Sequence, residues 1–107
     1  TKDVFLNIAG GIRVNDPALD LAVVMAILSS NMDTVLPHDT VFAGEVGLSG
    51  EIRAVSRIEQ RISEAEKLGF QQIFVPKGNQ KSLTKKVTDI QIRFVSKITD
   101  ICRLLFG

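Results

Sequence analysis

An apolar run near the start of the sequence restricts the fold more than any other feature. The eight residues Leu21–Leu28 are all apolar, and they follow the pair Asp16-Pro17, which is typical of a helix start with an aspartate N-cap and a proline in the first turn. A helix that is apolar on nearly every side must be covered on several of them. Residues 19–28 are therefore expected to form a central helix. Eight residues are also far fewer than the roughly 20 that a membrane-spanning helix needs.

The rest of the chain alternates between short strand-like and helix-like segments. Alternating apolar residues predict strands over residues 4–9, 41–46, 51–55, 73–75 and 90–94, and a turn at residues 47–50 joins the second of these to the third. Apolar stripes at helical spacing predict helices over 58–68 and 98–105, and a short polar helix is expected over 80–86. The order β-α-β-β-α-β-α-β-α indicates an α+β domain with a mixed sheet and packed helices.

Two signals mark the ends of the predicted helix over residues 58–68. Ser56 and Glu59 have the spacing of a capping box, in which each side chain satisfies a free backbone N–H of the other residue. Gly69 stands where a C-terminal cap is expected. The buried stripe between these signals is predicted to consist of Ile58, Ile62, Ala65 and Leu68.

Chain length and the scarcity of cysteine and histidine exclude several classes of protein. The 107 residues have the size of one domain, so residues 1–107 are expected to fold as a single unit. A content of 45% hydrophobic and 23% charged residues is ordinary for a globular domain and unlike that of a disordered tail. One cysteine and one histidine cannot form an internal disulfide or a structural zinc site.

Few residues of the chain suit catalysis. His38 lies in a predicted loop, where a surface role is favoured over that of a general base. Cys102 belongs to the apolar stripe of the last predicted helix, so we interpret it as a core residue rather than a nucleophile. Glu45 and Glu51 flank the predicted hairpin as a potential carboxylate pair, but solvated strand positions are the favoured interpretation.

Charge is distributed unevenly along the chain. Residues 1–50 contain two basic and six acidic residues, a net charge of −4, whereas residues 51–107 contain eleven basic and six acidic residues, a net charge of +5. Residues 77–97 alone carry a net charge of +5. A domain with such a basic pole can bind an anionic partner such as DNA, and an ordinary solvated surface is the alternative explanation.

Five basic residues of this segment form the candidate DNA-binding surface. Lys77, Lys81 and Lys85 are spaced four residues apart, so a helix through them aligns the three side chains on one face. Lys86 and Arg93, which is predicted to point outward from its strand, extend this surface. Lysine side chains suit contact with phosphates without base recognition. Four such contacts predict that log K falls with log salt at a slope of about −3.6.

The chain has features of a fragment. It begins at Thr1 without a methionine, and the first predicted strand starts almost at once. We therefore expect an N-terminal neighbour in a larger protein.

Two stretches of the chain resemble the peptidase domain of Lon-type proteases. They are the helix start NDPALD at residues 15–20 and GEVGLSGEIRAVSRIEQRISEAEKLGF at residues 44–70. The chain more closely resembles the C-terminal Lon-like domain of the RadA (Sms) family of bacterial DNA repair proteins, over essentially its whole length and including IFVPK at 73–77. The resemblance implies a Lon proteolytic-domain-like fold (ribosomal protein S5 domain 2-like), with the N-terminal part of that domain missing.

The resemblance to Lon-type proteases also bears on catalysis. These enzymes use a serine nucleophile and a lysine base, and the positions that match this dyad are Ala18 and Glu59. Alanine has no nucleophilic atom, and glutamate cannot replace an amine base. Asp20 stands where the peptidases have glycine and would add negative charge near a developing oxyanion. The resemblance therefore implies a pseudo-peptidase without catalytic residues.

The partners that the resemblance implies belong mainly to a larger protein. Members of the RadA family join a zinc motif and a RecA-like ATPase core to this domain, and they assemble as hexameric rings that move along DNA in recombinational repair. ATP, magnesium and zinc are therefore expected only in the missing N-terminal domains, and no cofactor is expected in this chain. DNA and further copies of the chain are the expected partners, in the bacterial cytoplasm and without a membrane, and contact with a recombinase is left open.

Three functions remain open on the sequence. The first is a scaffold that also binds DNA without sequence preference, within a DNA-dependent ATPase or helicase. The second is an oligomerisation platform that makes no contact with DNA. The third is an active, ATP-dependent Ser-Lys peptidase domain, which Ala18 and Glu59 disfavour.

Overall fold

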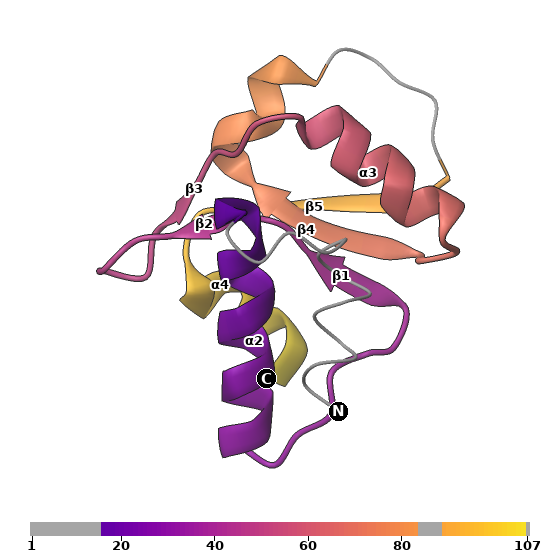
Figure 1. Ribbon diagram of the computed structural model, residues 1–107. Coiled ribbons are helices and arrows are strands. Elements are labelled where there is room, and N and C mark those ends of the chain that lie inside the picture. The colour runs from indigo at the N-terminus through magenta and orange to yellow at the C-terminus, as the bar shows by residue number, and fades with distance from the viewer. Residues whose placement is uncertain (1–15, 84–88, 107) are drawn as a thin grey trace.

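The computed structural model of the chain describes residues 16–83 and 89–106 (Figure 1). The predicted strand over residues 4–9 lies outside these ranges. With η denoting a 3₁₀ helix, the elements in chain order are η1 (Pro17–Leu19), α2 (Asp20–Asn31), β1 (Thr40–Phe42), β2 (Glu45–Val46), β3 (Ile52–Arg53), α3 (Ile58–Lys67), β4 (Gln72–Pro76), η2 (Lys77–Ser82), β5 (Gln91–Val95) and α4 (Ile98–Phe106).

Three parallel strands form the main sheet, in the order β1-β4-β5. Val41 of β1 is opposite Ile73 of β4, and Phe74 of β4 is opposite Arg93 of β5. The α+β class is confirmed, and the three described strands of the main sheet are parallel, because the segments between them carry the chain back to the end of the sheet where the previous strand began. An isolated antiparallel bridge joins Glu51 to Lys97, beyond the end of β5. Among the described strands, antiparallel pairing occurs in the separate hairpin of β2 and β3.

Helices cover both faces of this sheet. Helix α3 lies on one side of the strands, and α2 and α4 lie on the other (Figure 1). Successive residues of a strand point to opposite faces, so each face has its own apolar cluster. The cluster toward α2 and α4 consists of Leu21, Ala22, Met25, Phe42, Ile52, Phe74, Val95 and Ile101. The cluster toward α3 consists of Val41, Ala43, Ile58, Ile62, Ala65, Ile73, Val75 and Ile90.

Helix α2 is less enclosed than the sequence predicts. Its buried residues are Leu21, Ala22, Met25 and Ala26, whereas Ile27 keeps 45% of its surface exposed. Val23, Val24 and Leu28 are half-buried, so the expectation of a helix covered on several sides is met in part within the described residues. A helix that lies on one face of a sheet buries the stripe that faces the strands, and the described residues cover its other sides only in part.

The predicted strand over residues 41–46 is divided into β1 and β2. At the break, Ala43 donates its N–H to the Phe74 carbonyl (3.0 Å), whereas Gly44 forms its backbone hydrogen bonds with the start of α2. The chain therefore leaves the sheet at Gly44 and enters the hairpin. The predicted hairpin is confirmed, although β3 contains only two residues of the expected strand over 51–55.

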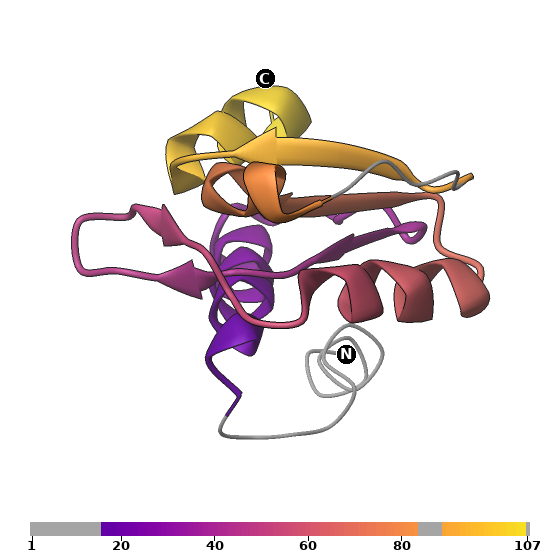
Figure 2. The same ribbon diagram turned by 90° about the horizontal axis from the view of Figure 1, so that it is seen from above.

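The hairpin of β2 and β3 projects sideways from the sheet (Figure 2). Its turn is closed by the N–H of Gly50, which donates to the Gly47 carbonyl at 3.0 Å, and Gly50 has a φ of 83°. A positive φ of this kind is readily adopted by glycine. Ile52 donates its N–H to the Ser96 carbonyl at 2.8 Å, so the base of the hairpin is joined to the end of β5.

Helix α3 begins one residue later than the predicted capping box requires. Its N-cap is Arg57, which has the left-handed conformation φ 57°, ψ 39° and makes no side-chain cap hydrogen bond. The placement of the N-cap at Ser56 is therefore wrong. Ser56 instead accepts a hydrogen bond from the Arg61 guanidinium through its backbone carbonyl (2.9 Å).

The C-terminal end of α3 agrees with the sequence. Gly69 has a φ of 94° and donates its N–H to the Glu66 carbonyl (3.0 Å), while Phe70 donates its N–H to the Ala65 carbonyl (3.1 Å). These two bonds form the Schellman arrangement that glycine favours. The predicted buried stripe is confirmed except at Leu68, which is 60% exposed because it lies at the C-cap, beyond the part of α3 that faces the sheet.

Helix α4 carries the last apolar stripe. Ile101 is fully buried and Cys102 is half-buried, so Cys102 lies at the margin of the core. Asp100 accepts the backbone N–H groups of Ser96 and Lys97, both at 3.1 Å, just before the helix starts. These hydrogen bonds lower the pKa of Asp100, because they stabilise its carboxylate form.

Candidate functional site

The position that matches the serine of a Lon-type dyad lies where η1 leads into α2. Asp16 caps this turn, since its Oδ1 accepts the N–H of Ala18 at 3.0 Å, and Pro17 occupies the first helical position. The predicted N-cap is confirmed. The Ala18 side chain is buried, with 3% of the residue exposed. A methyl group in a packed environment therefore stands where a nucleophile would be needed.

Backbone contacts close this position from the side of the β1–β2 connection. Gly44 donates its N–H to the Ala18 carbonyl and accepts the N–H of Leu21, both at 3.0 Å. A Cβ at position 44 would lie 2.8 Å from the Cγ2 atom of Ile52 and 3.3 Å from a methyl group of Leu21. Glycine is therefore needed here for close approach of the two segments.

A partly buried ion pair joins the same turn to α3. The Arg61 guanidinium binds the Asp16 carboxylate through two hydrogen bonds, Nη1 to Oδ2 at 2.9 Å and Nη2 to Oδ1 at 3.2 Å. The Arg61 and Asp16 side chains are 24% and 16% exposed. Two-point pairing of arginine with a carboxylate is among the stronger polar contacts in proteins. Glu59, the position that matches the lysine base, is half-buried in the first turn of α3, two residues before Arg61.

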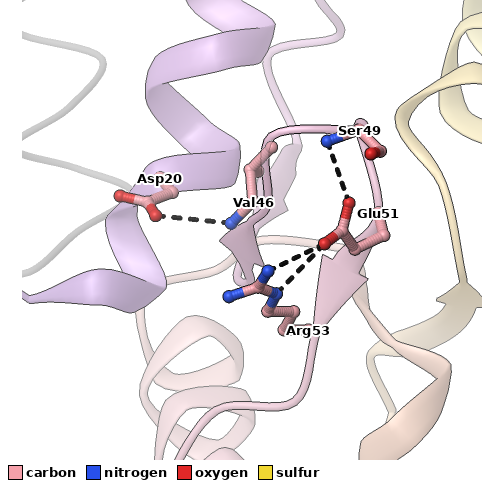
Figure 3. A network of polar contacts seen from close by, with 5 residues as sticks. All are labelled: Asp20, Val46, Ser49, Glu51 and Arg53. Atoms are coloured by element: carbon pink, nitrogen blue, oxygen red, sulfur yellow. Dashed lines mark hydrogen bonds and ion pairs between the residues drawn. The ribbon is translucent and has the colours of Figure 1, made fainter.

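Asp20 fastens the start of α2 to the hairpin (Figure 3). Its Oδ2 atom accepts the backbone N–H of Val46 at 3.3 Å. A carboxylate in the first turn also interacts favourably with the helix dipole. A backbone N–H next to the Ala18 turn is therefore bound to a carboxylate within the chain. We call Asp16, Ala18, Asp20, Gly44 and Arg61 the closed corner.

The two glutamates of the hairpin do not form a carboxylate pair suited to acid–base catalysis. Glu51 accepts the N–H of Ser49 (3.1 Å) and binds Arg53 at 2.8 Å (Figure 3). Glu45 is opposite Arg53 in the hairpin register, so a guanidinium accompanies both carboxylates. The backbone N–H of Glu51 itself and the Arg53 guanidinium lower the pKa of Glu51, and Glu51 in turn raises the pKa of Arg53.

Three of the five predicted DNA-binding residues lie within the described part of the chain. Lys77 and Lys81 are exposed on η2, while Lys85 and Lys86 lie outside the described residues. Because η2 is a 3₁₀ helix with three residues per turn, side chains four positions apart point about 120° apart. The helix also ends at Ser82. The predicted alignment along one continuous helix face is therefore wrong for Lys77 and Lys81.

Arg93 lies in a different environment from these lysines. It is opposite Phe74 in the sheet, on the face that packs against α2 and α4, and it is half-buried. Its Nε donates to the Oε1 atom of Gln72, whose Nε2 donates to the Thr40 hydroxyl at 2.9 Å. Arg93 thus takes part in a polar chain across three strands, and the prediction that it points freely outward is wrong.

Asn79 joins two segments of the chain, and the sequence analysis did not predict this role. It is buried, with 5% exposed, and its Oδ1 accepts the N–H of Val55 while its Nδ2 donates to the Val55 carbonyl, both at 2.9 Å. This two-point contact holds η2 against the segment that leads from β3 into α3. The partners are 24 residues apart, so no local pattern marks them.

The described residues offer no metal site. Among residues 16–83 and 89–106, no group of three or more histidine, cysteine, aspartate or glutamate side chains has a suitable arrangement. His38 is exposed in the loop before β1, as expected. Within the same ranges, no helix is both long and apolar enough to cross a membrane.

Comparison with known proteins gives one family and a consistent set of relatives. Residues 1–79 match the family model described as subunit ChlI of Mg-chelatase. DNA repair protein RadA of Streptococcus pneumoniae is 46% identical over 106 residues, which are 99% of this chain and 25% of that protein. The same protein of Bacillus subtilis is 43% identical over 106 residues, which are 99% of the chain and 23% of the relative.

A third relative has a similar identity and coverage. DNA repair protein RadA of Aquifex aeolicus is 46% identical over 105 residues, which are 98% of the chain and 23% of that protein. The chain therefore spans about a quarter of the length of the curated relatives it matches.

Proposed function

Because the chain belongs to the ChlI family and is homologous over its whole length to DNA repair protein RadA, we propose that it is the Lon-like region of a RadA-type DNA repair protein. In this proposal the region has no peptidase activity. It serves as a scaffold for a ring of copies and binds the DNA backbone without sequence preference. The ATPase activity, ATP, magnesium and zinc of the larger protein are assigned to parts outside the chain.

The observation that carries the loss of catalysis is the state of Ala18. Its buried methyl group stands at the position of the nucleophile, at the start of α2. The neighbouring polar groups are used within the chain: Asp16 binds Arg61, and Asp20 accepts the N–H of Val46. A backbone N–H that already binds a carboxylate is a poor donor for a developing oxyanion.

The same contacts support a scaffold role. The closed corner connects η1, α2, the β1–β2 connection and α3 through backbone hydrogen bonds and one two-point ion pair. Such cross-links favour a rigid body that can hold neighbouring domains and copies in fixed positions. A rigid domain suits a scaffold, because a scaffold holds other parts of the protein in place and does not react with a substrate.

The support for DNA contact is electrostatic. Lys77 and Lys81 are exposed, and neither forms an ion pair with a residue that the structure describes. All phenylalanines among the described residues are buried or half-buried, so no exposed aromatic ring is offered for base stacking. These features favour binding to phosphates, with strong salt dependence and little sequence preference.

A peptidase assay tests the first part of the proposal. The chain is incubated with an unfolded protein such as casein, and we expect no cleavage. Ala18→Ser is expected to remain inactive, because it adds a hydroxyl without a lysine base or a free oxyanion donor. Cleavage by the unaltered chain that a serine-directed inhibitor abolishes would contradict the proposal.

A salt titration tests the second part. Binding of a fluorescent duplex is measured by anisotropy between 50 and 200 mM salt, and four lysine–phosphate contacts predict a slope of about −3.6 in log K against log salt. Replacement of Lys77, Lys81, Lys85 and Lys86 by glutamine is expected to remove most of this slope. Lys81→Gln alone should make the slope smaller by about 0.9, and Lys67→Gln, which also removes one positive charge but in the last turn of α3, is its matched control. An oligomeric chain that binds no DNA would favour the platform without DNA contact.

A further inference from the structure

Among the described strands, β5 lies at one border of the main sheet, with β4 as its neighbour (Figure 2). The N–H of Gln91 donates to the Gln71 carbonyl at 2.9 Å, on the side of β4. Because successive residues of a strand direct their backbone polar groups to opposite sides, the N–H and carbonyl groups of Ile92 and Phe94 point away from β4. No described residue forms a hydrogen bond with these groups. We call them the open edge.

The outer edges of the β2–β3 hairpin differ from the open edge, because the chain itself supplies their partners. The N–H of Val46 donates to the Asp20 carboxylate, and the N–H of Ile52 donates to the Ser96 carbonyl. An unpaired strand edge can serve as a template for another strand, and proteins commonly guard such an edge with lysine, proline or a bulge. Strand β5 has the sequence QIRFV, which contains neither lysine nor proline, and its register with β4 shows no bulge.

The side chains of β5 determine which strand can pair with the open edge. Ile92 and Phe94 are half-buried against the apolar cluster toward α3, so part of their apolar surface is accessible. Arg93 is half-buried on the opposite face, where its Nε binds Gln72 and neither Nη atom forms a hydrogen bond with a described residue. An incoming strand therefore meets apolar surface on one face of the sheet and positive charge on the other.

We propose that the open edge binds an extended peptide segment of a partner protein, which adds to β5 as a further strand. The segment carries an apolar residue on its Ile92 and Phe94 side and an acidic residue on its Arg93 side. In strand addition the backbone hydrogen bonds supply affinity, and alternate side chains supply specificity. Charge complementarity favours an acidic segment, since residues 77–97 carry a net charge of +5. Pairing of β5 with β5 of a second copy would instead bring like charges together.

A peptide titration followed by NMR tests this inference. The probe is an octapeptide of alternating valine and glutamate, and amide hydrogen exchange in the isotope-labelled chain is measured with and without it. We expect bound peptide to slow exchange of the Ile92 and Phe94 amides by about tenfold or more, because their N–H groups become hydrogen-bonded. The amide of Arg93, which points toward β4, is the internal control and should change little. An octapeptide of alternating valine and lysine should bind more weakly.

Two substitutions in β5 separate the backbone contact from the side-chain contact. Ile92→Pro removes a donor of the open edge and leaves the groups that face β4 in place, since proline is tolerated where the N–H of an edge strand points outward. Ile92→Ala also loses the apolar side chain but keeps the N–H, so it is the matched control. We expect Ile92→Pro to lose peptide binding and Ile92→Ala to retain most of it. Arg93→Gln should weaken binding of the valine–glutamate peptide by about threefold.

The possible outcomes each decide the question. Equal peptide affinity in Ile92→Pro and Ile92→Ala, or unchanged exchange of the Ile92 and Phe94 amides at millimolar peptide, would overturn the inference. Protection of these amides that rises with chain concentration in the absence of peptide would assign the open edge to a second copy instead. If circular dichroism shows that Ile92→Pro is unfolded, the exchange measurement on the unaltered chain decides by itself.

Discussion

The closed corner and the 3₁₀ helix η2 both contain charged residues. Those of the closed corner are bound within the chain, whereas the lysines of η2 are exposed. In the closed corner, the Asp16 carboxylate and the Arg61 guanidinium bind each other, and Asp20 binds a backbone N–H. On η2, Lys77 and Lys81 remain exposed, and neither forms an ion pair with a described residue. Charges satisfied within the chain stabilise the fold, whereas exposed charges of one sign are available to a partner.

The difference separates the positions that match a peptidase dyad from the surface that is proposed to bind DNA. The positions that match a peptidase dyad lie in or beside the more tightly cross-linked region. The proposed binding surface lies at the carboxyl end of β4, where one amide contact positions it. Changes in the closed corner should therefore affect stability, and changes to the lysines of η2 should affect DNA binding.

The largest expected effect follows from Arg61→Ala. This change leaves the partly buried Asp16 carboxylate without its two-point partner and removes the bond to the Ser56 carbonyl. We expect the free energy of unfolding to fall by about 2–3 kcal/mol. Urea denaturation followed by circular dichroism measures this loss. The exposed pair of Arg103 and Asp100, 3.9 Å apart, provides the control, since Arg103→Ala should cost at most about 0.5 kcal/mol.

Asn79→Ala is the exception to this division, because it is expected to lower both the free energy of unfolding and the affinity for DNA. The N–H and carbonyl of Val55 lose their side-chain partner, at a cost of about 1–2 kcal/mol. DNA affinity should also fall, although no charge is removed, since η2, which carries Lys77 and Lys81, is no longer held against Val55. A loss of stability with unaltered DNA affinity, measured below the unfolding transition, would show that the contact does not position the lysines of η2.

Gly44→Ala tests whether packing as well as charge holds the closed corner. The new Cβ would lie 2.8 Å from the Ile52 methyl group, which must move, and we expect a loss of about 1 kcal/mol. Gly50→Ala also introduces a methyl group, but there a Cβ would meet nothing within 4 Å and the cost comes from the positive φ alone. Thermal melts measure the cost of steric overlap in Gly44→Ala and the cost of the positive φ in Gly50→Ala. The affinity for DNA should be unchanged in both variants.

The smallest effect concerns pH and the cap of α4. The pKa of Asp100 is lowered in the folded chain by its hydrogen bonds with the N–H groups of Ser96 and Lys97. Its contribution is therefore present above the unfolded pKa, which is near 3.9, and is lost as the pH falls through the folded pKa. Asp100→Ala should cost about 0.5–1 kcal/mol at pH 7 and progressively less in acid. A cost that is the same at pH 7 and pH 2 would contradict this assignment.

Local signals in the sequence predicted several features of the fold correctly. The Asp16-Pro17 helix start and the glycine cap at residue 69 depend on residues within one turn of each other. The apolar stripe of α3 and the strands around Phe74 and Phe94 are equally local. Such features follow from backbone geometry and from alternation, so they are readable without tertiary contacts.

The remaining features depend on contacts between distant residues. Asp16 and Arg61 are 45 positions apart, and Val55 and Asn79 are 24 positions apart, so neither contact has a pattern along the chain. The division of the predicted strand at Gly44 results from its hydrogen bonds with Ala18 and Leu21. Lysines spaced four residues apart lie on one face of an α-helix. Because η2 is a 3₁₀ helix, the same spacing does not align them there.

The Asp16 carboxylate makes two contacts, and these limit which substitutions the turn tolerates. A single carboxylate caps the turn that contains Ala18 and also anchors Arg61, so this turn is held by bonds that a hydrolase would have to rearrange. Reintroducing a hydroxyl and an amine would still leave an arginine clamp and a bound N–H beside them. Introducing proteolysis at this turn would therefore require several coordinated substitutions.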